Sequence, residues 1–175
     1  MHWYNTVFEV IDMRSFSNLW YWIALAVLWS SVSHWVMGVP FDMILRARRG
    51  RESQAMPELE LLVRLNVDRI LYIADVSGTW ILLFGSAVLT GTAILAFFYW
   101  IEFAQAVLLL LGPLAILGAL SIGTARRIRR DGSAGQALVK RLLRHRFATQ
   151  LLGVLAIFVT AMFGMWQNLY VGPFG

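Results

Sequence analysis

Two histidines are the side chains with the clearest capacity for cofactor chemistry. His34 stands near the end of the first long apolar stretch, and His145 stands just before the last one. Two imidazoles at one side of a membrane could ligate haem or a metal ion. The sequence offers no second histidine pair, no H-x-x-x-H spacing and no carboxylate inside either stretch. We therefore expect no cofactor, and we interpret both histidines as interfacial anchors or hydrogen-bond partners for Ser30 or Ser31.

Nucleophilic and hydrolytic chemistry lacks its usual residues in this chain. There is no cysteine, which excludes disulfides, thiolate metal sites and cysteine-bound iron–sulfur clusters within the chain. The motifs G-x-S-x-G, H-E-x-x-H and G-x-x-x-x-G-K-[ST] are also missing. Apart from Glu102, which is expected at a turn, the long apolar stretches contain no Asp, Glu, Lys or Arg, although a proton or ion pathway needs ionisable groups at depth. We expect neither an enzyme nor a proton-coupled transporter.

Lysine and arginine gather in two short polar segments of an otherwise apolar chain. Hydrophobic residues make up 59% of the sequence, and the mean hydropathy is +0.65. Of the 15 basic residues, only Arg14 lies outside these two segments. Short loops rich in Lys and Arg stay on the cytoplasmic side of a membrane, so this basic charge indicates a membrane protein and not a nucleic-acid-binding one. The residues expected to bind anionic lipid headgroups or a protein partner are Arg46, Arg48, Arg49, Arg51, Arg126, Arg127, Arg129, Arg130, Lys140, Arg141, Arg144 and Arg146.

Four apolar segments are long enough to cross a bilayer as helices. A span needs about 20 apolar residues, and Leu19–Met37 and Phe147–Tyr170 each supply them. Val76–Thr124 contains one charged residue, Glu102, and would be about 73 Å long as a single helix. It must therefore fold into a hairpin, with its turn near Tyr99–Phe103. We predict spans at about 19–39, 77–98, 104–124 and 147–170 within a single domain of 1–175, with cytoplasmic loops at 40–76 and 125–146.

Charge and aromatic residues predict the same orientation in the membrane. Positive loops on the inside place both termini and the Tyr99–Phe103 turn outside. The first fifteen residues lack a basic n-region and no cleavage site follows, so the first span is expected to remain in the mature protein. We predict a multi-pass protein of the bacterial inner membrane. The aromatic anchors are Trp20, Trp22, Trp100, Trp166 and Tyr170 at the outer interface, and Trp35 and Trp80 at the inner one.

Each cytoplasmic loop is predicted to contain a helix. Pro57 suits the first position of a helix, and apolar residues from Leu59 to Ala74 recur at helical spacing. Glu60, Arg64 and Asp68 follow each other at i, i+4 on its polar face. This amphipathic helix is expected to lie on the membrane or on the helix bundle, or to form a docking groove, and to break near Gly78. A second, basic helix is predicted from Gln136 to Arg146.

Small residues are expected to let the spans pack closely against one another. Small side chains at i, i+4 let helix backbones approach closely where lipid supplies no hydrophobic drive. Pro113 is expected to kink the third span. An interface between copies of the chain is the alternative role for these positions. The ladders are Ala87 and Gly91 in the second span, Ala115, Ala119 and Gly123 in the third, and Ala156, Thr160 and Gly164 in the fourth.

The N-terminal third of the chain resembles a family of small alphaproteobacterial inner-membrane proteins. The resemblance rests on Phe8–Arg49 and on LVRLNVDRILYIAD, residues 62–75. These proteins carry the label "component of SufBCD complex", after the Suf iron–sulfur cluster assembly system. The resemblance implies an accessory that docks soluble Suf proteins at the membrane.

The sequence thus predicts an all-α membrane protein with four transmembrane helices and both termini outside. One cytoplasmic amphipathic helix and one basic cytoplasmic helix complete the fold. Its expected function is that of a non-enzymatic adapter, which docks a cytoplasmic partner or stabilises a membrane assembly. The alternative is a small oligomeric channel or uniporter, because the spans carry Ser, Thr and Gly that could line a pore. A third interpretation is a haem-binding redox subunit that uses His34 and His145.

Overall fold

Helices account for almost all of the residues that the computed structural model describes, which are 16, 18–50 and 54–170. The fold is all-α, as the sequence predicts. One short β-hairpin, with two residues in each strand, follows the first apolar helix. In chain order the elements are α2 (Leu19–His34), β1 (Trp35–Val36), β2 (Val39–Pro40), α3 (Phe41–Arg49), α4 (Ala55–Phe97), α5 (Glu102–Asp131) and α6 (Gly135–Tyr170).

Three of the described helices, α4, α5 and α6, are long and apolar enough to cross a membrane. The remaining apolar helix, α2, has 16 residues and is about 24 Å long. The side chain of Asn18 caps its start by accepting from the Trp20 N–H at 3.0 Å. The helix predicted over 19–39 ends early, at His34.

The β1–β2 hairpin is the reason for that early end. Trp35 pairs with Pro40 and Val36 pairs with Val39, in an antiparallel arrangement. Met37 and Gly38 form the turn with φ values of 53° and 80°. Pro40 has no backbone N–H, so it could not make the hydrogen bond that a continued α2 would require. It is the last residue of the hairpin, and α3 begins at the next residue.

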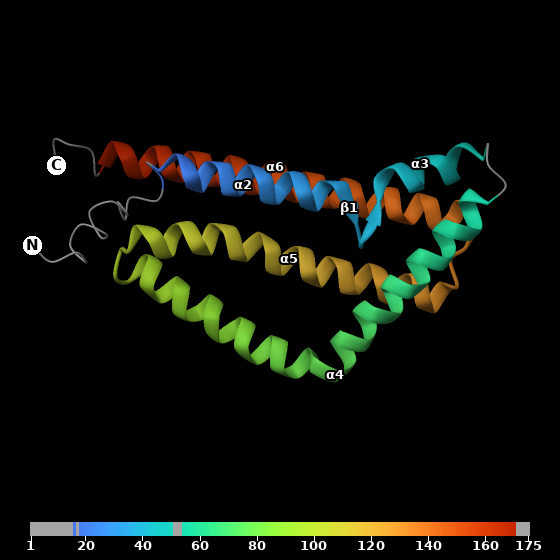
Figure 1. Ribbon diagram of the computed structural model, residues 1–175. Helices are drawn as coiled ribbons and strands as arrows, with labels where there is room; N and C mark the ends of the chain where they lie inside the picture. The colour runs from blue at the N-terminus through green and yellow to red at the C-terminus, as the bar shows by residue number, and fades with distance from the viewer. Residues whose placement is uncertain (1–15, 17, 51–53, 171–175) are drawn as a thin grey trace, which may run out of the picture.

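Helix α4 joins the predicted amphipathic helix and the predicted second span without a break. The expected interruption near Gly78 is wrong, because α4 is helical from Ala55 to Phe97. Figure 1 instead shows α4 changing direction about midway along its length. Ser77 and Gly78 lie close to that midpoint by residue number, and Gly/Ser pairs are a common cause of a bend that keeps the helix continuous.

The predicted basic helix is likewise the first part of a longer helix. Residues 136–146 belong to α6, and the basic residues 126–130 belong to the end of α5. Only residues 132–134 separate the two helices. Gly132 adopts a left-handed conformation with φ 55° and donates its N–H to the Ile128 carbonyl. Pro113 lies inside α5, which shows no change of direction comparable with that of α4 in Figure 1.

The elements form a bundle with two different ends (Figure 1). At one end the α4–α5 turn, residues 98–101, meets the start of α2 and the end of α6. There the Phe16 N–H donates to Glu102 Oε1 at 2.8 Å, and the rings of Trp100 and Trp166 lie 6.4 Å apart. The other end consists of α3, residues 55–75 of α4, residues 125–131 of α5 and residues 135–146 of α6. We call it the cationic end, because every Lys and Arg of the described residues lies in it.

The packed core lies at the cationic end. In α4, one residue in every four is buried up to Leu71, and no further α4 residue is buried until Ala96. A smaller cluster of Leu25, Trp29 and Ala156 joins α2 to α6. The main core contains Val36, Met37, Val39, Ile44, Ala47, Ala55, Leu59, Val63, Val67, Leu71, Ala125, Ile128, Leu138, Val139 and Leu142.

Candidate functional site

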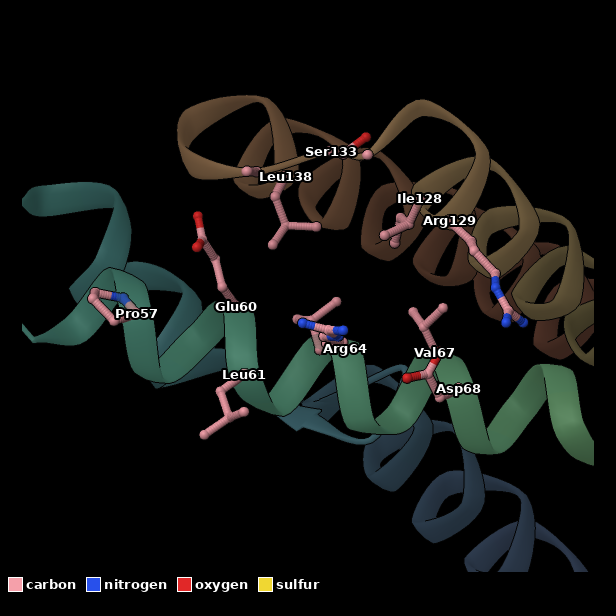
Figure 2. Close-up of a pocket in the computed structure, with 13 residues that line it drawn as sticks. Pro57, Glu60, Leu61, Arg64, Val67, Asp68, Ile128, Arg129, Ser133 and Leu138 are labelled. Carbon is pink, nitrogen blue, oxygen red and sulfur yellow. The ribbon is translucent and has the colours of Figure 1, made fainter.

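A groove of about 710 Å³ lies at the cationic end. It lies between the first half of α4 and the turn that joins α5 to α6 (Figure 2). We call it the α4–α5 groove. Its lining residues are Pro57, Glu60, Leu61, Val63, Arg64, Val67, Asp68, Ile128, Arg129, Gly132, Ser133, Ala134 and Leu138.

The groove combines an apolar interior with charged side chains at its mouth. Figure 2 shows Glu60 and Val67 rising from α4 toward Leu138, Ile128 and the α5–α6 turn, whereas Leu61 points away. Val63, Val67, Ile128 and Leu138 belong to the buried core, so the inner wall is apolar and fixed by packing. A concave apolar surface with a few charged groups around it is typical of a binding site.

A hydrogen bond from α6 to α4 holds the two walls of the groove together. Glu60 Oε1 accepts from the Gly135 N–H at 2.6 Å, and Gly135 is the first residue of α6. A carboxylate at a helix N-terminus is stabilised by the unpaired N–H groups and by the helix dipole. Glu60 therefore serves as a tertiary cap for α6.

Asp131 holds the α5–α6 turn through two arginines. Its carboxylate oxygens lie 2.8 Å from Arg141 Nη2 and 3.1 Å from Arg130 Nε. These two hydrogen bonds, that of Arg141 first, hold the pKa of Asp131 below its ordinary value of 3.8. The carboxylate is therefore ionised at neutral pH and ties α5 to α6.

The predicted basic residues of the second loop gather around the groove and beside it. Arg129 lines the groove and also a neighbouring cavity of about 250 Å³, which Arg126, Arg130, Leu71 and Asp75 complete. Arg127, Lys140 and Arg144 are exposed elsewhere on the same end. The structure thus brings three of the predicted arginines, Arg126, Arg129 and Arg130, around one cavity.

The predicted basic residues of the first loop lie on α3. Arg46 Nη2 is 3.9 Å from Asp42 Oδ2, and Arg48 and Arg49 follow in the last turn of this helix. None of these three side chains lines the α4–α5 groove. Arg51 lies outside the described residues.

One contact connects α3 with the basic part of α6. The guanidinium of Arg146 lies over the ring of Phe41, with its central carbon 3.1 Å from the ring centroid. Such cation–π contacts contribute on the order of 1 kcal/mol. Arg146 is therefore partly engaged within the chain, and is a less available contact for lipid or a partner than the sequence alone suggests.

The three small-residue ladders lie in different surroundings. In α6, Ala156 and Thr160 are buried, and a methyl group at Gly164 would lie 3.1 Å from the Phe16 ring. In α4 and α5, a methyl group at Gly91 or Gly123 would have nothing within 4 Å. The residues Ala87, Ala115 and Ala119 of these two helices are exposed. Among the described residues, only the ladder of α6 packs against another part of the chain.

The two candidate haem or metal ligands lie in unlike surroundings. His34 is exposed at the end of α2, with its ring against that of Trp35. His145 is buried, and its Nδ1 lies 3.0 Å from Thr124 Oγ1. Among the described residues no group of three or more His, Asp or Glu side chains is placed to hold a metal ion.

Three charged residues of α4, Glu60, Arg64 and Asp68, line the groove but are not among the site residues predicted from the sequence. A docking groove on this amphipathic helix was one of the predicted alternatives, but it was not assigned to particular residues. The i, i+4 spacing of the three residues was the available signal, because charged residues along one helix face must share a common surrounding.

Comparison of the chain with protein-family models, with curated protein sequences and with solved structures found no match.

Proposed function

We propose that the chain is a non-enzymatic adapter of the bacterial inner membrane, which docks a cytoplasmic protein in the α4–α5 groove. The observation that carries this proposal is the contrast between the two ends of the bundle. The cationic end has a packed core, a cavity and nearly all of the charge, whereas the remaining length of α4 is apolar and almost wholly exposed.

A membrane position accounts for the exposed apolar surface. Large apolar side chains such as Trp80, Leu82 and Phe84 stand more than half exposed on α4. A water-soluble protein rarely leaves so extended an apolar surface uncovered, whereas lipid covers it at no cost. In this proposal α4, α5 and α6 cross the bilayer, and the shorter α2 crosses it as well, as the first of four spans along the chain. Positive loops inside then place both termini outside.

The expected occupant of the groove is an acidic segment with apolar side chains, carried by a cytoplasmic protein. Its apolar side chains would meet the wall formed by Val67, Ile128 and Leu138. Its carboxylates would meet Arg64 and Arg129, for which bidentate pairing is the favoured geometry. The family resemblance makes soluble Suf assembly proteins the first partners to test.

The test is recovery of a partner from native membranes in mild detergent, followed by direct binding of the purified partner. Arg64→Gln and Arg129→Gln remove the two cationic side chains of the groove, and each is expected to weaken binding at least about tenfold. Arg127→Gln is the matched control, because Arg127 is an exposed arginine of α5 that does not line the groove. Equal binding by all three variants would contradict the adapter proposal.

Anionic lipid is the competing ligand for the same arginines. Basic residues near a membrane surface contribute about 1 kcal/mol each to its attraction for anionic headgroups. Binding to lipid depends on the number of charges, so Arg127→Gln and Arg129→Gln should then have equal effects. Binding to a protein in the groove should distinguish them.

A second candidate function, an oligomeric channel or uniporter, has one observation in its favour. In the described part of the chain, Ala115 and Ala119 of α5 are exposed, and a methyl group at Gly123 would have nothing within 4 Å. Small residues at this spacing are common where membrane helices associate. Native mass spectrometry and solute flux in liposomes test this candidate, and a monomer without flux would exclude it.

A further inference from the structure

A cavity of about 350 Å³ lies where the β1–β2 hairpin meets three helices. We call it the hairpin pocket. Ser31 of α2, Ser121 of α5, and His145 and Thr149 of α6 contribute its polar side chains. Trp35 and Leu117 are among its apolar walls. Three segments distant in sequence, residues 31–38, 117–121 and 145–149, thus converge on one site, which does not share a residue with the α4–α5 groove.

The hydrogen bonds around His145 define which ring nitrogen is available. His145 is 6% exposed, and its Nδ1 lies 3.0 Å from Thr124 Oγ1. The single hydroxyl hydrogen of Thr124 is donated to the Leu120 carbonyl at 2.9 Å. We therefore assign Thr124 Oγ1 as the acceptor and Nδ1 of His145 as the donor, the tautomer that uses both hydrogen bonds. Burial penalises the charged imidazolium, so the neutral ring presents a lone pair at Nε2.

The Thr149 hydroxyl reinforces this arrangement. It donates to the carbonyl of His145 itself at 3.0 Å, one helical turn away. Its hydrogen is therefore unavailable to Nε2. A hydrogen-bond donor for Nε2 has to come from elsewhere, and among the described residues no protein donor to this atom is found.

The lining of the hairpin pocket selects against charged ligands. Among the described residues that line it there is no Asp, Glu, Lys or Arg, although the cationic end is close in sequence. Its surface is mainly apolar, and the indole of Trp35 offers a flat face on which a ring can stack. The hydroxyls of Ser31 and Ser121 supply two more positions for hydrogen bonds. Such a site suits a neutral ring that carries hydroxyl groups.

We propose that the hairpin pocket binds a neutral aromatic alcohol of the quinol class, whose hydroxyl donates to Nε2 of His145 while its ring lies beside Trp35. His145 directly precedes the expected fourth span, so the pocket lies at the membrane interface, where the headgroup of an amphiphile is accessible. This site is independent of the adapter function proposed above.

The test uses the full-length protein in nanodiscs of neutral phosphatidylcholine, under argon. A short-chain benzoquinol is titrated by calorimetry against the dimethyl ether of the same ring, which cannot donate. The quinol is expected to bind at least about fivefold more tightly than the ether, which is the usual scale for one hydrogen bond. Addition of the quinol, but not of the ether, should also move the ¹⁵N resonance of His145 Nε2.

Variants separate this site from a general effect on the fold. His145→Ala is expected to abolish the preference for the quinol over the ether, and Ser121→Ala to weaken quinol binding about threefold or more. Ser30→Ala is the matched control, because Ser30 adjoins Ser31 on α2 but does not line the pocket. If His145→Ala fails to fold, Ser121→Ala and the ether comparison still decide. Equal affinity for quinol and ether, or unchanged preference in the folded His145→Ala variant, overturns the proposal.

Discussion

At Gly38 the hairpin lies close against Asn66 of α4. The Gly38 φ of 80° is a conformation that L side chains rarely adopt, and an added methyl group would lie 3.0 Å from Asn66 Oδ1. Asn66 in turn donates to the Leu62 carbonyl at 3.1 Å, which keeps its side chain in place. Gly38 therefore combines a backbone requirement with a steric one.

We predict that Gly38→Ala lowers the free energy of unfolding by about 2 kcal/mol or more, through strain and the clash with Asn66. Gly50→Ala is the matched control. Gly50 also has a positive φ, of 62°, but a methyl group there would have nothing within 4 Å. It should cost only the backbone strain, about 1 kcal/mol. Unfolding in detergent measures both, and equal losses would contradict the steric part of the argument.

The ion pairs of Asp131 predict a dependence of stability on pH. The pKa of Asp131 is lowered in the folded chain, so its contribution is complete above the ordinary value of 3.8 and is lost as the pH falls below it. Asp131→Asn should therefore lower the melting temperature at pH 7, and the difference from wild type should vanish in acid. A double-mutant cycle with Arg141→Gln is expected to be non-additive, and additivity would show that the pair does not interact.

At the scale of elements, two helix faces carry glycines in opposite surroundings. On α6, a methyl group at Gly153 would lie 2.8 Å from Cε3 of Trp29, so α2 packs directly on this glycine. On α5, methyl groups at Gly112 and Gly118 would have nothing within 4 Å. The α2–α6 contact therefore requires glycine at position 153. The described contacts of α5 place no such requirement on Gly112 or Gly118.

We predict that Gly153→Ala destabilises the protein by separating α2 from α6. Gly118→Ala should be neutral or stabilising by up to about 1 kcal/mol, because alanine is the better helix former. The measurement is unfolding of both variants in detergent. A loss of stability or of oligomeric mass in Gly118→Ala would instead show that the α5 face packs against another molecule.

The sequence predicted the existence of the helices better than their ends. The length of the apolar stretches was sufficient to predict helices within α4, α5 and α6, because long apolar segments leave little ambiguity. Gly78 was expected to interrupt α4, but backbone groups that leave water must bond within the helix, which favours a bend over a break. The hairpin after His34 was missed, since Val36–Pro40 reads equally well as the apolar end of a helix.

At the scale of the whole molecule, charge and packing divide the bundle in the same way. The division of charge could be read from the sequence, because it is a matter of position along the chain. The α4–α5 groove could not, since its walls are more than 60 residues apart in places and come together only in the folded core; the Glu60–Gly135 bond, for example, joins residues 75 apart. The hairpin pocket likewise depends on an element that the sequence did not predict.

The proposed topology predicts a labelling pattern. The chain has no cysteine, so single substitutions report position without a background. In intact spheroplasts, a membrane-impermeant maleimide should label Tyr99→Cys, in the α4–α5 turn, from outside. Ser133→Cys, in the α5–α6 turn, should react only after permeabilisation. Labelling of Ser133→Cys in intact cells would exclude this orientation.

The continuity of α4 has a mechanical consequence. This one helix forms a wall of the groove and then continues, without a loop, through the apolar length of the bundle. A loop at Gly78 would have let the two halves turn independently. Because α4 is one continuous hydrogen-bonded helix with one bend, the positions of its two halves are coupled. A ligand that shifts its first half must tilt the second half or change the angle between them.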